Sequence, residues 1–261
     1  MSVRPSPEEH PGAALESPEH YLGTSALLDL QDSKLRLRAR SLTQLCKTDR
    51  EKAMALHNYV KRLTFERPFK LRLRTAREVM KAGRGDAADK SALLVALLRL
   101  CNIPARIRFV ELRGDIMRGL GASTAPTPRP VVEIWLGTRW VRTDTYIYDV
   151  EYVAAARQRL KDKAWEWGYG IHRNGHSIWN GTDDAVLGGF PMEQDPMVLQ
   201  MLGVFHDPLQ FVRSDLFRSK ERPLGRLLHV NMLALGMRQV VRTLREEASR
   251  KAPRSRSGNL L

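Results

Sequence analysis

The chain has 261 residues, of which 43% are hydrophobic and 28% are charged. At roughly 100–200 residues per domain, this length corresponds to one elaborated domain or two small ones. The composition excludes a disordered, collagenous or disulfide-stapled protein. The 43 lysines and arginines exceed the 29 aspartates and glutamates, for a formal net charge of +14. Nucleic acid and acidic peptides or proteins are therefore candidate partners.

The two cysteines, Cys46 and Cys101, lie outside any CxxC or Cys/His cluster. They predict neither a disulfide framework nor a metal site, and no motif indicates a cofactor. Such cysteine usage fits a reducing compartment and favours a cytoplasmic location.

Both ends of the chain are expected to be flexible tails. Residues 1–22 are rich in Pro, Glu and Ser, and residues 248–261 are basic. The first segment also lacks the apolar stretch of a secretory signal. The most apolar later segment, Leu227–Met237, contains His229 and Asn231. It is far shorter than the roughly 20 residues of a membrane span, so we expect a buried helix there and no membrane span.

Positive charge is concentrated in the segment Lys61–Arg77. Its basic residues are Lys61, Arg62, Arg67, Lys70, Arg72, Arg74 and Arg77, against one acid, Glu66. Such a patch can attract polyanions by releasing counterions. However, the sequence contains no zinc finger, RNP-like strand or Gly-rich phosphate loop. The pattern favours a solvated basic surface, and binding of nucleic acid or an acidic partner stays open as the alternative.

Helical periodicity dominates the chain after the first tail. Apolar residues at helical spacing predict helices over 27–46 and 49–63. Alternating basic and apolar residues at 70–74 indicate an extended connection. A short helix is predicted from Ala76, ending near Gly83.

The next segment predicts a central buried helix. Residues 92–100 are apolar almost all round, as in a helix that is packed on every side. Asp86 is expected to cap this helix, and Asp89 places an acid at the positive end of the helix dipole. Pro104 lies beyond the end of the helix, and Ala105–Leu112 is predicted as a strand.

A loop over 113–130 is expected to separate this strand from a β-hairpin. Val131–Leu136 and Arg139–Asp144 flank Gly137-Thr138, a two-residue turn signal. Helices followed by antiparallel strands predict an α+β fold in which the buried helix packs on an antiparallel sheet.

Beyond residue 150 we predict a mainly helical extension packed on the core. Helices are expected over Tyr152–Lys163, around Met197–Leu202 and over Leu224–Glu247, with an aromatic, turn-rich stretch at 165–184. The expected organisation is a tail over 1–22, a core over 23–150, the extension over 151–247 and a basic tail over 248–261.

Two blocks of sequence carry a family resemblance. The first is Gly83-Arg84-Gly85-Asp86-Ala87-Ala88-Asp89-Lys90-Ser91, followed after the apolar helix by Arg99-Leu100-Cys101-Asn102-Ile103-Pro104-Ala105-Arg106. The second is Val132-Glu133-Ile134-Trp135-Leu136 with Arg139-Trp140-Val141-Arg142-Thr143-Asp144. Together they resemble the core of the bacterial transglutaminase-like superfamily, which has a papain-like cysteine protease fold. Its members read G-x-C-x-D-K-A/S, then R-x-x-G-I-P-A-R, then H-x-W-V-E-V with W-V-x-x-D. The resemblance covers roughly residues 26–150.

In that family a cysteine at the helix N-terminus attacks an acyl carbonyl, a histidine takes its proton, and an aspartate orients the histidine. Carried over by position, the cysteine is replaced by Ala87 and the histidine by Arg129, while the aspartate is retained as Asp144. A methyl group cannot attack a carbonyl. A guanidinium, with a pKa above roughly 12, cannot act as a general base at neutral pH. The resemblance therefore implies the scaffold of a cysteine peptidase or acyltransferase without its nucleophile and base.

In place of the catalytic pair, Arg129 and Asp144 are expected to form an ion pair that leaves a cationic pocket against the helix N-terminus. Such a pocket can hold a carboxylate or another anion. The residues expected to bind the ligand are Arg84, Gly85, Asp86, Lys90, Arg129 and Trp140.

The other thiols and histidines are weaker candidates for a catalytic or metal-binding site. Cys101 lies at the far end of the buried helix, where the dipole disfavours a thiolate, and Cys46 is expected to be packed. His172 and His176 are separated by Asn174-Gly175, a turn signal, so a zinc pair is not favoured. The residues His57, Trp135, Trp140, Trp165 and Trp167 are expected to have packing roles.

Three functional hypotheses follow. The first is a catalytically inactive transglutaminase-like protein that acts in binding or as a scaffold. The second is a cysteine peptidase or acyltransferase of this superfamily in an inactivated form. The third is a scaffold that binds polyanions through Lys61–Arg77 or the basic tail. The double replacement at Ala87 and Arg129 favours the first hypothesis.

Overall fold

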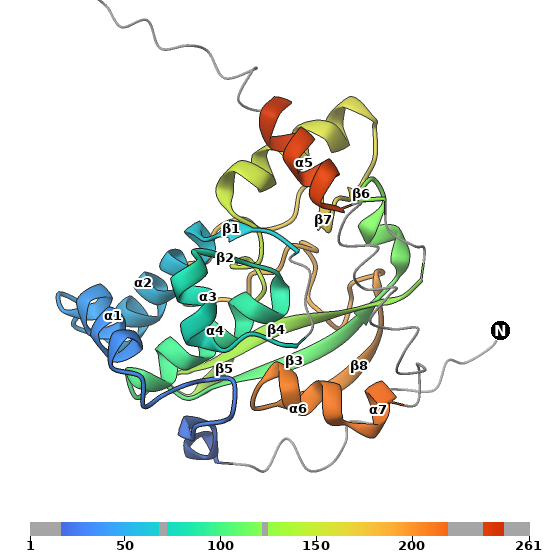
Figure 1. Ribbon diagram of the computed structural model, residues 1–261. Coiled ribbons are helices and arrows are strands. Elements are labelled where there is room, and N and C mark those ends of the chain that lie inside the picture. The colour runs from blue at the N-terminus through green and yellow to red at the C-terminus, as the bar shows by residue number, and fades with distance from the viewer. Residues whose placement is uncertain (1–16, 68–71, 122–124, 219–236, 248–261) are drawn as a thin grey trace, which may run out of the picture.

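A computed structural model describes residues 17–67, 72–121, 125–218 and 237–247 (Figure 1). The α-helices are α1 (Ser33–Thr43), α2 (Asp49–Arg62), α3 (Ala76–Ala82), α4 (Ala87–Leu100), α5 (Val150–Asp162), α6 (Pro208–Arg213) and α7 (Asp215–Arg218), with 3-10 helices η1 (Pro18–Leu22) and η2 (Gly114–Met117). The strands are β1 (Thr64–Phe65), β2 (Arg84–Gly85), β3 (Ala105–Leu112), β4 (Thr127–Leu136), β5 (Arg139–Thr143), β6 (Trp167–Gly168), β7 (Ile171–His172) and β8 (Val198–Phe205). Residues 237–247 are also helical.

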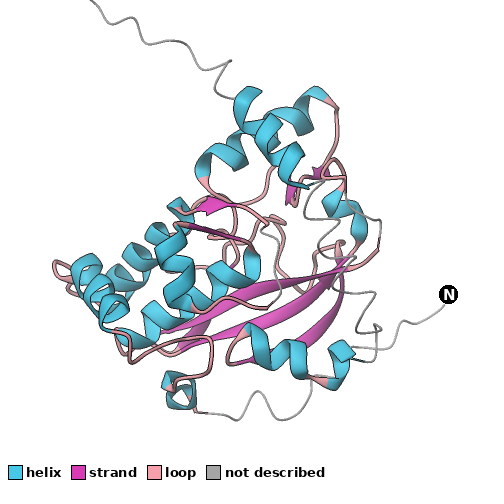
Figure 2. Cartoon of the chain, in the orientation of Figure 1, coloured by secondary structure: helices cyan, strands magenta, loops and turns pink. Residues whose placement is uncertain are grey.

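The central sheet has four antiparallel strands in the order β5-β4-β3-β8. β4 and β5 form the predicted hairpin, with Leu136 opposite Arg139. Gly137 in its turn has a φ of 67°, which a residue without a Cβ adopts most easily. The predicted α+β class is confirmed (Figure 2).

α4 is the predicted central buried helix and lies against β3 and β4 (Figure 1). Its residues from Ala92 to Leu98 are no more than 1% exposed. Asp86 and Asp89 form a capping box, in which each carboxylate accepts the other residue's backbone N–H, at 3.0 and 3.2 Å. This arrangement satisfies N–H groups that have no partner inside the helix and contributes about 1 kcal/mol.

Two further helices follow the sequence prediction. α2 and α3 both begin at capping boxes, headed by Thr48 and Thr75. α3 ends at Gly83, whose φ of 65° is the left-handed conformation that glycine favours at a helix end.

α1 is shorter than the helix predicted over 27–46. It begins at Ser33 because the Asp32 carboxylate accepts the N–H groups of Lys34 and Leu35, both at 3.0 Å. The apolar residues before it are buried in turns and contribute to the core without being helical. Cys46 lies beyond the end of the helix.

The loop predicted over 113–130 ends earlier than expected. β4 begins at Thr127 because it pairs with β3, so that Thr127 lies opposite Leu112 and Arg129 opposite Val110. Arg129 is therefore fixed in a strand.

The predicted helix around Met197–Leu202 is wrong, because the residues from Val198 onward belong to β8. β8 pairs with β3, with Ile107 opposite Phe205. A short apolar run suits a buried strand as well as a helix, and the neighbouring strand decides between them. The central sheet thus includes a strand from beyond residue 150.

The described chain begins within the segment expected to be a flexible tail. Tyr21 of η1 is 3% exposed and lies under the Arg106 guanidinium, whose carbon is 5.1 Å from the ring centre. The rest of that tail, the C-terminal tail and most of the expected helices at Leu227–Met237 and Leu224–Glu247 lie outside the described residues. In the described part of the chain, no helix is long and apolar enough to cross a membrane.

Candidate functional site

Ala87 is the first residue of α4 and its methyl group is half-buried. The chain approaches it through β2, which pairs in parallel with β1. Gly85 in β2 tolerates no side chain, since a Cβ there would lie 2.7 Å from the Cβ of Asp89. The chain around Ala87 therefore forms a tight strand-to-helix turn.

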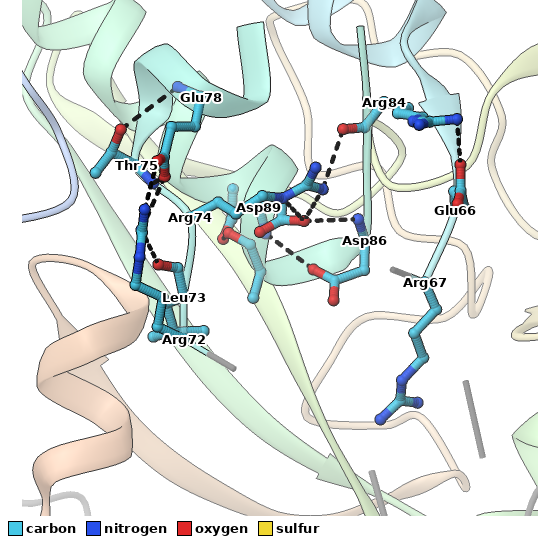
Figure 3. A network of polar contacts seen from close by, with 12 residues as sticks. Glu66, Arg67, Arg72, Leu73, Arg74, Thr75, Glu78, Arg84, Asp86 and Asp89 are labelled. Atoms are coloured by element: carbon cyan, nitrogen blue, oxygen red, sulfur yellow. Dashed lines mark hydrogen bonds and ion pairs between the residues drawn. The ribbon is translucent and has the colours of Figure 1, made fainter. Parts of the chain in front are cut away.

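A buried carboxylate holds this turn together (Figure 3). Asp89 is 2% exposed, accepts the Asp86 N–H and forms an ion pair with Arg74, whose Nε lies 3.1 Å away. Arg84 is exposed and lies 3.2 Å from Glu66. Gly85, Asp86 and Asp89 therefore shape the helix N-terminus, and Arg84 lies at its surface.

Arg129 and Asp144 form the ion pair that the sequence predicted. The Arg129 Nη1 donates to Asp144 at 3.3 Å, and the Nη2 donates to the carbonyl oxygen of Gly170 at 2.6 Å. Asp144 also accepts the Leu187 N–H at 2.7 Å. Both side chains are buried. Burial raises the pKa of Asp144, and the Arg129 charge and the Leu187 hydrogen bond oppose that shift.

Gly170 packs closely beside this ion pair and leaves no room for a side chain. It has a φ of 79°, and a Cβ there would lie 1.9 Å from the Tyr148 hydroxyl. Tyr148 is 3% exposed, and burial raises its pKa. Beside it, the Tyr146 hydroxyl donates to the Pro130 carbonyl at 3.1 Å. Gly170, Leu187 and Tyr148 could not be predicted from the sequence as neighbours of this pair, because they belong to segments without a recognisable motif.

The structure does not bring Lys90 to this ion pair. Lys90 has no exposed surface, and its ammonium donates to the carbonyl oxygens of Leu63, at 2.8 Å, and Lys61, at 3.3 Å. These carbonyls lie at the C-terminal end of α2, where helix carbonyls lack partners. Lys90 therefore ties α4 to α2, in place of the ligand contact expected from the sequence.

Trp140 also lies apart from Arg129. It pairs with Trp135 across the hairpin, and Trp135 is six residues beyond Arg129 on the same strand, about 20 Å by strand rise. The Arg106 guanidinium covers the Trp140 ring at 4.0 Å. Trp140 therefore packs at the other end of the sheet, and the structure does not place it with the other expected ligand residues.

Acidic residues outside the segment neutralise much of Lys61–Arg77 (Figure 3). The ion pairs are Arg72–Glu78, Arg74–Asp89 and Arg77–Asp32. Arg72 lowers the pKa of Glu78 to about 2, so this pair stays ionised. Lys61 is only 8% exposed. The charge density of the sequence segment is therefore much reduced at the surface.

The stability of the protein is expected to rise between pH 7 and pH 9. Burial lowers the pKa of Lys90 to about 7 and that of Lys61 to about 8, against 10.5 in an unfolded chain. In this interval the unfolded state binds more protons than the folded state, so raising the pH favours folding. The expected gain is about 3–4 kcal/mol for the two groups together. Urea unfolding at pH 7, 8 and 9 measures it.

Lys90→Met should make the rise of stability with pH smaller, because it removes one of the two titrating groups and leaves Lys61. Lys81→Met, at an exposed position, is the control and should leave the slope unchanged. A slope that is equal in all three proteins would contradict the assignment to Lys90.

The other thiols and histidines have packing roles. His57 is fully buried, with Nε2 2.9 Å from the Thr145 hydroxyl, and burial lowers its pKa to about 3. Cys101 is half-buried, and burial raises its pKa, which disfavours a thiolate. Near His172, the Gly175 N–H donates to the His172 carbonyl in the expected turn. In the described ranges, no group of three or more His, Cys, Asp or Glu side chains is placed to hold a metal ion.

Comparisons with known proteins gave one family match and two solved structures of low identity. Residues 36–145 match the family model of the transglutaminase-like superfamily. A search of curated proteins found no match. Among solved structures, the chain is similar to a "putative cysteine protease" from Cytophaga hutchinsonii (19% identity, TM-score 0.39), over 47% of this chain and 39% of that one. It is also similar to a "putative protease" from Parabacteroides distasonis (18% identity, TM-score 0.34), over 48% of this chain and 26% of that one.

The chain thus matches less than half the length of either solved structure. The family match spans α1 to the end of the β4–β5 hairpin, and so includes both the N-terminus of α4 and the Arg129–Asp144 pair. Over these residues, which make up less than half of the chain, the chain is similar to the core of the transglutaminase-like superfamily.

Proposed function

We propose that this chain is a transglutaminase-like protein that does not perform thiol acyl transfer and that acts as a binding or scaffold protein. The observation that carries the proposal is the pairing of Arg129 with Asp144, the retained acid of the family motif. Together with Ala87 at the helix N-terminus, this pair leaves the motif without a nucleophile and without a base.

The ion pair has a structural consequence for the former base position. In the family, the acid orients an imidazole that exchanges protons. Here a buried guanidinium bridges the acid and the Gly170 carbonyl. A guanidinium stays protonated, so this arrangement holds three segments of chain together and moves no proton.

The cationic pocket remains a prediction. The Arg129 side chain is 8% exposed, and its charge is already paired with Asp144. An acidic ligand would have to compete with that carboxylate. The polyanion-binding alternative has less support than the sequence suggested, because acids from other segments pair with much of Lys61–Arg77.

Assays of the unmodified full chain test the proposal. Peptide cleavage and amide exchange should stay at the level of an Asp144→Asn variant, since neither protein has a nucleophile in the motif. Circular dichroism establishes that both proteins are folded. Turnover by the unmodified chain that disappears in Asp144→Asn would overturn the proposal and favour an enzyme with a different nucleophile.

A further inference from the structure

We propose that a cavity between α1, the segment after η1 and the C-terminal end of α4 binds a phosphate-bearing anion. It has a volume of about 440 Å³, within the roughly 300–1,000 Å³ of typical small-molecule sites. Its main lining residues are Leu22, Leu30, Leu100, Arg36, Arg40 and Arg99. Leu100 is at the opposite end of α4 from Ala87, about 20 Å away by helical rise, so this site is independent of the function proposed above.

Arg99 places a buried positive charge at one wall of the cavity. It is 5% exposed. Its Nη2 donates to the carbonyl oxygens of Ala105, at 2.8 Å, and His206, at 3.3 Å, and its Nη1 donates to that of Gly23. Among the described residues, no carboxylate lies within ion-pair distance of it, although Asp207 is near enough to oppose the lowering of its pKa by burial. The charge is thus solvated by carbonyl dipoles and not neutralised.

Arg36 and Arg40 add two further charges to the lining of the cavity. They are one turn apart on α1, where like charges repel. Arg36 donates to the Leu30 carbonyl at 2.8 Å and to the Gln31 side-chain oxygen at 2.7 Å, both neutral acceptors. Arg40 is exposed and has no hydrogen-bond or ion-pair partner among the described residues. The two side chains therefore retain donors and charge for an anion.

The composition of the lining selects for an anion. None of the described residues that line the cavity is acidic. A neighbouring cavity of about 610 Å³ shares Thr24, Leu30 and Gln31 with it, but that cavity contains the Asp32–Arg77 ion pair and so has compensated charge. Guanidinium groups match phosphate oxygens in fork-like geometry. Arg40 keeps its guanidinium donors free for such contacts, and the charges of Arg36 and Arg99 beside it suit a phosphate-bearing ligand, with the leucines in contact with its less polar part.

Calorimetric titration of the full chain with inorganic pyrophosphate tests this proposal, with ionic strength held constant by sodium chloride. Saturable binding is expected. Arg40→Gln and Arg36→Gln should each weaken it about tenfold or more, because each removes a charge-assisted hydrogen bond. Both positions are exposed, and thermal unfolding establishes that the variants are folded.

Arg38→Gln is the matched control, because Arg38 is on the same helix, is exposed and lies over the Tyr59 ring, outside the cavity. It should bind pyrophosphate as the unmodified chain does. Absence of saturable binding would overturn the proposal. Equal weakening by Arg38→Gln and Arg40→Gln would also overturn it, because it would show attraction to the basic helix as a whole.

Discussion

Ala87→Cys should give a thiol at the N-terminus of α4 that reacts with iodoacetamide but performs no acyl transfer. The helix N-terminus favours a thiolate, but Arg129 is held by Asp144 and cannot take up a proton. Adding Arg129→His places an imidazole next to Asp144. The double variant should be alkylated about tenfold faster near neutral pH, because an adjacent imidazolium lowers the pKa of the thiol and raises the fraction present as thiolate.

Ala88→Cys provides the matched control for this experiment. It lies one residue further along α4, in the same turn and the same dipole field, but points in a different direction. When Ala88→Cys is combined with Arg129→His, the rate of alkylation should rise little. The unmodified chain gives the background from Cys46 and Cys101. Acyl transfer by Ala87→Cys alone would contradict the proposal that the chain is a binding or scaffold protein. It would support an enzyme that is inactivated at one position.

Glu133→Gln should be among the most destabilising substitutions in the chain. Glu133 has no exposed surface, and its oxygens lie 2.6 Å from the Arg106 Nε, 2.5 Å from the Arg108 Nε and 3.3 Å from the Arg142 Nε. Burial alone would raise its pKa, but the charges of Arg108 and Arg106 hold it below the usual value. Removing the charge takes away the buried carboxylate that Arg106 and Arg108 share, at an expected cost of about 3–5 kcal/mol in unfolding free energy.

Glu193→Gln is the control, because Glu193 also pairs with Arg142 but its side chain is 58% exposed. Exposed pairs contribute about 0–1 kcal/mol, so urea unfolding should show a small change. Equal changes in unfolding free energy for the two substitutions would show that the ion pairs of Glu133 do not stabilise the sheet. The ionised state of Glu133 contributes stability above its unfolded pKa, and this contribution should be lost as acid protonates it.

Some elements could be predicted because the signals that form them are local. Such signals are the capping box of Asp86 and Asp89 at the start of α4, the apolar surface of that helix and the Gly137-Thr138 turn. Each of them involves residues only a few positions apart. Their hydrogen bonds and burial patterns are therefore visible in the sequence. The resemblance to the family pointed to Ala87, Arg129 and Asp144 as candidate site residues, and the structure brings Arg129 and Asp144 together.

Contacts between distant segments were not predictable in this way. The residues of β8 became a strand because β3 offers an unpaired edge, and no local signal excludes a helix there. Lys90 lies in a motif that suggested a ligand contact, yet the end of α2 accepts its hydrogen bonds. The basic segment Lys61–Arg77 was neutralised by acids that the segment itself does not contain.

The sequence by itself determined the central helix and the hairpin, because each depends on residue identity at local positions. Only the tertiary structure decided how the charges are compensated. Arg129 is paired and bridged to Gly170, whereas Arg99 is surrounded by carbonyls beside a cavity. The physical reason is that the free energy of a charge depends on its burial and on its nearest partners, and folding sets both.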